Sequence, residues 1–147
     1  MASQVQLIPG LPALDALTAT HKYVILDFTA TWCPPCKAIA PFYEKLATEH
    51  AAEGALAFGK VDVDEAPDVA SKFGVTAMPT FVFLVDGENA GVDVGLPAKP
   101  NLVRLEGSGD EGPLVAIRGA DPHSLLGAVK SVAELATAAN AAKAEVS

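Results

Sequence analysis

The chain has 147 residues, half of which are hydrophobic, and its 10 Lys and Arg residues against 18 Asp and Glu residues give a formal net charge of −8 at pH 7. This length suits one domain with a substantial core, and the negative charge argues against nucleic acid or an anionic membrane as a partner. No stretch is apolar for long enough to span a membrane.

Residues 1–6 contain neither the basic region nor the continuous apolar region of a signal peptide. We therefore expect a cytoplasmic protein. The chain has two cysteines, and in a reducing compartment such a pair is more often catalytic than a structural crosslink.

The first half of the chain predicts a strand, a helix, a buried strand and a long helix. Residues 4–8 alternate polar and apolar side chains, as a short strand does, and leucines recur at helical spacing over residues 11–20. Residues 23–29 form an apolar run, which predicts a strand covered on both faces and favours a parallel α/β sheet. Apolar residues then recur at helical spacing from Cys33 to residue 52.

The second half of the chain predicts three more strands and two more helices. Residues 57–63 and 80–85 have the composition of strands. Residues 67–73 begin with a proline suited to a first helical turn and predict a short helix. Residues 114–118 predict the last strand, and a final helix follows with Asp121 as its N-cap and a proline at its first position.

A long segment, residues 88–112, separates the last two predicted strands and is rich in glycine, proline and charge. The preceding Asp86-Gly87 pair is a strong hairpin signal, yet the next convincing strand begins only at residue 114. Residues 102–106 alternate and are compatible with local pairing. Loops of this length are usually functional or disordered. We expect a single domain over residues 1–147 with an insertion at about 88–112.

The two cysteines, Cys33 and Cys36, lie where the buried strand meets the long helix, a placement typical of a redox site. Unpaired N–H groups and the dipole at the start of the helix favour the thiolate of Cys33. Cys36 is one turn later, is expected to lie deeper, and can attack the mixed disulfide that Cys33 forms. Pro34 and Pro35 suit the first helical positions, where a missing N–H costs least.

Two other interpretations of the pair are a structural disulfide and half of a zinc site. Zinc is disfavoured because no second pair of cysteines or histidines accompanies the first, and we expect no metal. The acidic cluster Asp62, Asp64, Glu65 and Asp68 is interpreted as a solvated edge and not a calcium loop.

The order of these elements, together with the Cys-X-X-Cys motif and the sequence Met78-Pro79-Thr80, resembles the thioredoxin family. The likeness covers nearly the whole chain apart from residues 88–112, and residues 61–81 are most similar to eukaryotic cytosolic thioredoxins. It implies an α/β thioredoxin fold with a central mixed five-stranded sheet flanked by four helices. It also implies a monomeric reductase of protein disulfides without a bound cofactor, recharged from NADPH by a thioredoxin reductase.

The resemblance implies roles for residues outside the motif. Asp27 matches the family's buried aspartate beneath the resolving cysteine. Burial raises the pKa of a carboxyl, which allows the aspartate to accept the proton of Cys36. Lys60 matches the lysine that neighbours this aspartate in the family. Pro79 matches the family's cis-proline, which leaves the backbone of Met78 free to pair with an extended substrate. The rest of the docking surface is matched by Trp32, Gly119 and Ala120.

The chain departs from the family at two places. Pro34 replaces the usual glycine after the first cysteine, which removes an N–H and predicts a shifted reduction potential of undetermined sign. In this topology the strand from Thr80 leaves the active-site end, so we expect residues 88–112 to decorate the opposite pole from Cys33. Two alternatives stay open, a more oxidising disulfide isomerase and a thioredoxin-fold binding or regulatory module.

Overall fold

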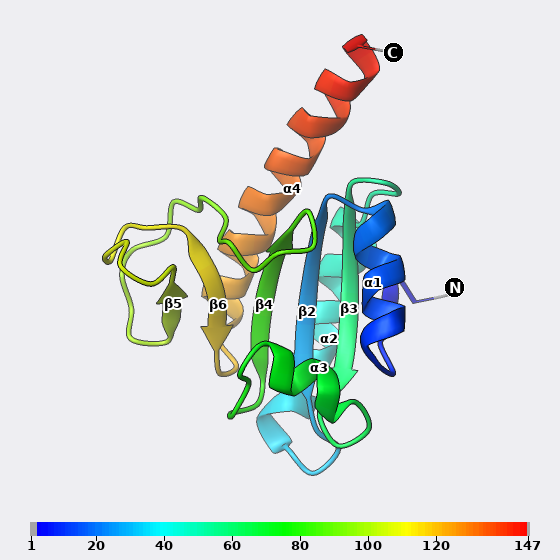
Figure 1. Ribbon diagram of the computed structural model, residues 1–147. Helices are drawn as coiled ribbons and strands as arrows, with labels where there is room; N and C mark the ends of the chain where they lie inside the picture. The colour runs from blue at the N-terminus through cyan, green and yellow to red at the C-terminus, as the bar shows by residue number, and fades with distance from the viewer. Residues whose placement is uncertain (1–2, 147) are drawn as a thin grey trace.

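The computed structural model describes residues 3–146, in which a twisted sheet is enclosed by helices (Figure 1). Residues 1, 2 and 147 lie outside the described part. The first two belong to residues 1–6, the segment predicted to lack a signal peptide. The elements are β1 (Val5–Leu7), α1 (Leu11–Thr20), β2 (Tyr23–Thr29), α2 (Pro34–His50), β3 (Leu56–Asp62), α3 (Pro67–Lys72), β4 (Thr80–Val85), β5 (Leu102–Arg104), β6 (Leu114–Arg118) and α4 (Pro122–Val146).

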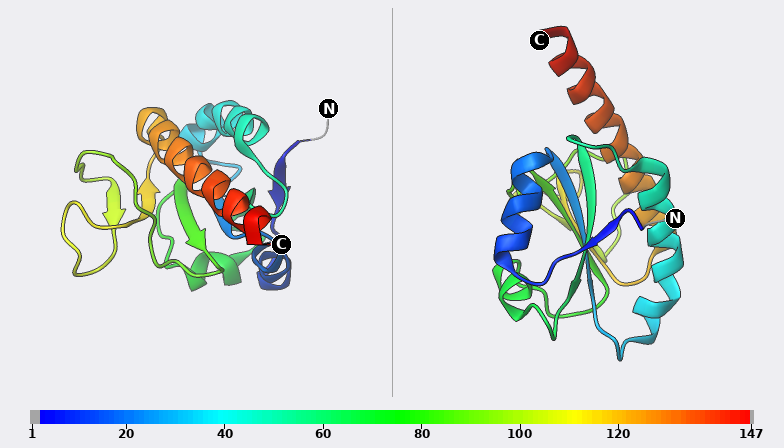
Figure 2. Two further views of the ribbon diagram at one scale, coloured as in Figure 1. Left: turned by 90° about the horizontal axis from the view of Figure 1, so that it is seen from above. Right: turned by 90° about the vertical axis from the view of Figure 1, so that its right-hand side faces the viewer.

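Within this part of the chain the strands form one mixed sheet in the order β1-β3-β2-β4-β6-β5. β3 is parallel to both β1 and β2, whereas β4, β6 and β5 each run antiparallel to the preceding strand in this order. The helices α1 and α3 cover one face, and α2 and α4 cover the other (Figure 2, right). The central strand β2 is therefore buried on both faces, as its largely apolar sequence predicts.

The strand count differs from the prediction of five because β5 is a sixth strand within the predicted insertion. Residues 102–104 pair with β6, and the register shifts between Val103 and Arg104. Without β5, strand β6 would be a free edge with unpaired backbone groups. Leu102 is buried, so the alternation seen in the sequence has a core-facing side.

Residues 88–112, called the arm from here on, pack against the domain at several points, although residues 97–100 and 105–111 are exposed. Val92 is buried and exchanges two backbone hydrogen bonds with Leu114. Leu96 packs over Gly127 of α4, where an added Cβ would lie 2.6 Å from a methyl group of the leucine. These contacts make the arm part of the core on the α4 side of the sheet.

The arm leaves β4 at the pole opposite the cysteines, as expected, but its middle returns toward the cysteine end beside β6 (Figure 1). The carbonyl of Asn101 accepts a hydrogen bond of 2.9 Å from the N–H of Arg118, and Arg118 pairs with Thr80 at the start of β4. The expectation that the arm decorates only the far pole is therefore wrong for its middle, because β5 pairs antiparallel to β6 and must begin at the cysteine end.

No helix within residues 3–146 is both long enough and apolar enough to cross a membrane.

Candidate active site

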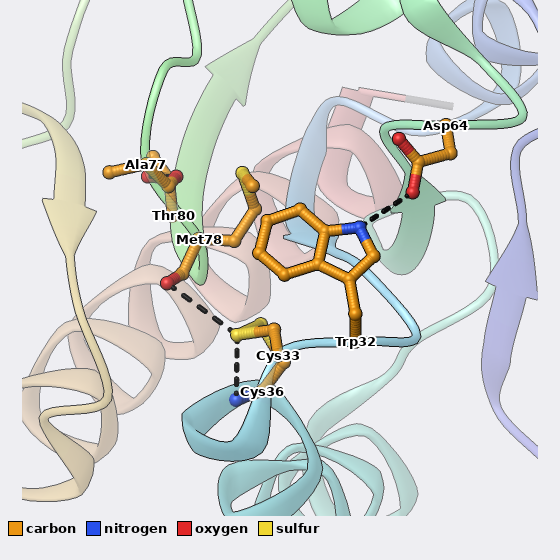
Figure 3. The surroundings of a disulfide bond; sticks show 7 residues. All are labelled: Trp32, Cys33, Cys36, Asp64, Ala77, Met78 and Thr80. Carbon is orange, nitrogen blue, oxygen red and sulfur yellow. Dashed lines mark hydrogen bonds between the residues drawn. A yellow bond between two sulfur atoms is a disulfide. The ribbon is translucent and has the colours of Figure 1, made fainter.

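Cys33 and Cys36 are joined in a disulfide at the start of α2, with their Cα atoms 5.3 Å apart (Figure 3). Cys33 is the N-cap residue in extended conformation, and Pro34 and Pro35 occupy the first two helical positions. The helix begins one residue later than predicted, because the residue at the cap is not yet helical. The predicted placement of the pair at the junction of β2 and α2 is confirmed.

One backbone N–H of the first helical turn faces the sulfur of Cys33. The amide of Cys36 donates to Cys33 Sγ at 3.2 Å, while Pro34 and Pro35 have no N–H to donate. In the dithiol state this bond and the positive end of the helix dipole both stabilise a thiolate at Cys33.

The two cysteines are equally covered, each with 3% of its surface exposed. The expectation that Cys36 lies deeper than Cys33 is therefore wrong for the disulfide state. Ala30 is buried with the pair, and Met78 packs against it. Cys33 Sγ lies 3.7 Å from the carbonyl oxygen of Met78 (Figure 3), so the loop before β4 closes over the first sulfur.

That loop contains the cis peptide bond between Met78 and Pro79 that the resemblance implies. The hydroxyl of Thr80 donates to the carbonyl of Ala77 at 2.7 Å and closes the loop. The carbonyl of Pro79 accepts a hydrogen bond of 2.7 Å from the N–H of Gly119. The cis-proline loop and the turn after β6, far apart in sequence, therefore lie side by side.

Trp32 precedes the disulfide and is 63% exposed. Its indole N–H donates to a carboxylate oxygen of Asp64 at 2.9 Å (Figure 3). Asp64 is exposed, as predicted for a solvated edge, and it also holds the indole of Trp32. The sequence gives one weak signal, since Asp64 follows the end of β3, beside the strand β2 that leads to the motif.

Asp27 on β2 is 1% exposed, and one of its carboxylate oxygens has no hydrogen-bond partner among the described residues. Burial raises the pKa of Asp27 from 3.8 to about 7, although the positive charge of Lys60 acts in the opposite direction. Lys60 is its register partner on β3 and, with Cys36, lines a cavity of about 680 Å³. Solvent in this cavity has access to Lys60 and Cys36.

The turn after β6 consists of Gly119, in the left-handed region at φ 90°, and the exposed Ala120. Asp121 follows, and one of its carboxylate oxygens accepts a hydrogen bond of 3.1 Å from the N–H of Ser124. This confirms the predicted N-cap of α4. Among residues 3–142, no group of three or more His, Cys, Asp or Glu side chains is arranged to hold a metal ion.

Comparison with known proteins agrees with this geometry. The family model described as Thioredoxin matches residues 14–105. The chain is 42% identical over 123 residues to a thioredoxin-like protein of Fusarium culmorum, covering 84% of this chain and 86% of that one. It is 37% identical over 136 residues to a thioredoxin of Neurospora crassa, covering 92% of each. A solved structure of Malassezia sympodialis thioredoxin superposes with a TM-score of 0.66 at 32% identity, covering 90% of this chain and 93% of that one.

Proposed function

The chain belongs to the thioredoxin family and is a thiol-disulfide oxidoreductase that reduces protein disulfides. On this premise we propose that Cys33 attacks the substrate disulfide and that Cys36 resolves the mixed disulfide. The observation that carries this assignment is the hydrogen bond from the amide of Cys36 to Cys33 Sγ. It stabilises negative charge on Cys33 and not on Cys36.

The reaction then has two exchange steps. The Cys33 thiolate attacks one sulfur of the substrate disulfide, and the other substrate sulfur leaves as a thiolate and takes up a proton. The Cys36 thiolate next attacks Cys33 Sγ, which forms the Cys33–Cys36 disulfide and releases the second substrate sulfur. Two electrons pass to the substrate, and the protein ends in the disulfide state that the structure contains.

We assign Asp27 the role of base for Cys36. A carboxyl with a pKa of about 7 is well matched to accept a thiol proton near neutral pH. The unpartnered oxygen of Asp27 and the cavity lined by Cys36 and Lys60 support this assignment. Lys60 stabilises the charged form of Asp27 before the proton arrives, because its positive charge opposes the effect of burial.

The substrate segment is proposed to lie across the covered disulfide. The backbone of Met78, next to Pro79, offers pairing groups for an extended chain. Trp32 supplies an exposed aromatic surface on one side, and Gly119 and Ala120 form the opposite rim.

The remaining assignments belong to the same proposal. Electrons come from NADPH through a thioredoxin reductase, and the protein acts as a monomer in the cytosol, in the manner of eukaryotic cytosolic thioredoxins, without a bound cofactor. Residues 1–147 act as one domain with the arm inserted, because β5 and β6 belong to the same sheet as the rest. Pro34, which supplies no N–H to the sulfur, shifts the reduction potential relative to members with glycine there.

NADPH-coupled reduction of insulin by the protein with a thioredoxin reductase tests the proposal. Cys33→Ser should abolish turnover, and Cys36→Ser should stop after one exchange and accumulate a mixed disulfide through Cys33. Accumulation through Cys36 in the Cys33→Ser variant instead would reverse the assignment. Full biological activity of Cys33→Ser would favour a binding module, and an oxidising equilibrium with glutathione would favour an isomerase.

A further inference from the structure

Asp121 joins two parts of the protein through its two carboxylate oxygens. One oxygen caps α4. The other accepts hydrogen bonds from the ammonium of Lys99 at 2.7 Å and from the amide of Asn101 at 3.0 Å. Both donors belong to the arm. The side chain of Asp121 is 15% exposed and that of Lys99 is 42% exposed, so these bonds lie at the surface of the domain.

The arm also holds the residue before the turn. The carbonyl of Asn101 accepts the N–H of Arg118 at 2.9 Å. Asn101 therefore contacts the chain on both sides of Gly119 and Ala120, through its backbone on one side and its side chain on the other. Gly119 in turn donates to the carbonyl of Pro79 at 2.7 Å, which connects the arm to the loop over the disulfide.

We propose that Lys99 and Asn101 are positioning residues that fix the turn of Gly119 and Ala120 and thereby set the affinity for protein disulfides. This inference rests on the proposed function, in which that turn is one rim of the docking surface. The substrates concerned are proteins whose disulfide lies in an extended segment, because only such a segment reaches from Met78 to the turn. The arm affects substrate affinity and does not affect the exchange reaction at Cys33 and Cys36.

The contacts at Asp121 persist over the working pH range. Burial disfavours the charged form of Asp121, but hydrogen bonds from Lys99, Asn101 and Ser124 outweigh it and hold its pKa well below the usual range. An ionised acceptor is thus present at every pH at which the exchange chemistry runs.

The fold of the arm does not depend on these two side chains. The guanidinium of Arg104 donates to the carbonyls of Leu96 and Gly112, both at 3.0 Å, and Leu96 packs on Gly127. Removing the donors of Lys99 and Asn101 should therefore free the turn while the arm stays in place.

The test is the double variant Lys99→Met, Asn101→Leu, assayed for insulin reduction with a thioredoxin reductase. We expect the KM for insulin to rise about three- to tenfold with kcat within about twofold of the wild type, the pattern of lost binding. Hydrogen exchange of the Gly119 amide should accelerate, because its bond to Pro79 opens more often. Lys99→Arg in an otherwise unchanged chain should retain the wild-type KM.

Lys130→Met serves as the matched control, since it removes an exposed lysine of α4 that lines a hollow together with His50 of α2. An unchanged KM in the double variant, with wild-type insulin reduction intact, would overturn the inference. So would a fall in kcat with KM unchanged. Absence of insulin reduction by the wild type would instead overturn the proposed function on which the inference rests.

Discussion

Asp27 on β2 stands directly opposite Lys60 on the parallel strand β3, yet burial outweighs the attraction of the lysine and raises the pKa of the aspartate to about 7. The protein therefore keeps in its core a carboxyl whose charged form is disfavoured. Such a group affects both stability and catalysis, and each effect has a distinct dependence on pH.

Asp27→Asn should stabilise the oxidised protein at high pH. Between pH 3.8 and about 7 the folded protein holds a proton on Asp27 that the unfolded chain has lost, so the free energy of unfolding falls by about 1.4 kcal/mol per pH unit. The total is on the order of 4 kcal/mol above pH 7. The advantage of the variant should be small at pH 4 and largest at pH 8 in urea unfolding. Asp15→Asn, at an exposed position, is the matched control. A difference for Asp27→Asn that does not change with pH would contradict the prediction.

The same substitution should slow the resolving step. In the wild type, release of the mixed disulfide should accelerate with pH and level off above pH 7, as Asp27 becomes able to take the proton of Cys36. Asp27→Asn should lose this inflection and react about 10- to 100-fold more slowly at pH 7. Single-turnover kinetics across pH measures this. An inflection retained in the variant would assign the base to another group.

Asp64→Leu should weaken substrate binding by freeing the indole of Trp32. Loss of the 2.9 Å hydrogen bond corresponds to about 1 kcal/mol, or about a fivefold rise in the KM for insulin. Asp64→Asn keeps an acceptor oxygen at the same position and should stay close to the wild type. If both variants raise the KM for insulin equally, the charge of Asp64 matters and the hydrogen bond does not.

Gly127→Ala and Leu96→Ala should show strong coupling in a double-mutant cycle. Alanine in a helix is favoured over glycine by about 1 kcal/mol, but an added Cβ at Gly127 would lie 2.6 Å from the leucine methyl group. Gly127→Ala should thus stabilise the Leu96→Ala background by about 1 kcal/mol and give the wild type no gain. Urea unfolding of the four proteins measures the coupling, and additive effects would contradict the packing.

Replacing the arm by a tight turn should destabilise the protein substantially. Val92 and Leu102 are 3% and 7% exposed, and burial of such side chains contributes about 1.5–3 kcal/mol each. Thermal and urea unfolding of the shortened chain should show this loss. Equal stability of the two chains would mean that the arm is an appendage, as the sequence alone suggested.

Long periodic elements and the redox motif could be predicted from the sequence. Apolar composition predicts β2, and apolar residues at helical spacing predict α2. One capping side chain predicts the start of α4. The cis bond before Pro79 came from resemblance, because only the family context distinguishes it from an ordinary turn proline. These predictions agree with the structure.

The remaining features depend on contacts between distant segments. β5 has three residues, and the short alternation over residues 102–106 does not identify β6 as its partner strand. Asp64 and Trp32 are 32 positions apart, and no spacing rule joins them. The cover over Cys33 is supplied by Met78, 45 positions later. A single sequence contains no direct record of such pairings.

The chain contains one tryptophan, and Figure 3 shows it beside the disulfide. A disulfide near an excited indole quenches its emission, so opening the bond should brighten the protein's tryptophan fluorescence, to which no second tryptophan contributes. The fluorescence of Trp32 should thus report the oxidation state of the disulfide in real time and without a label.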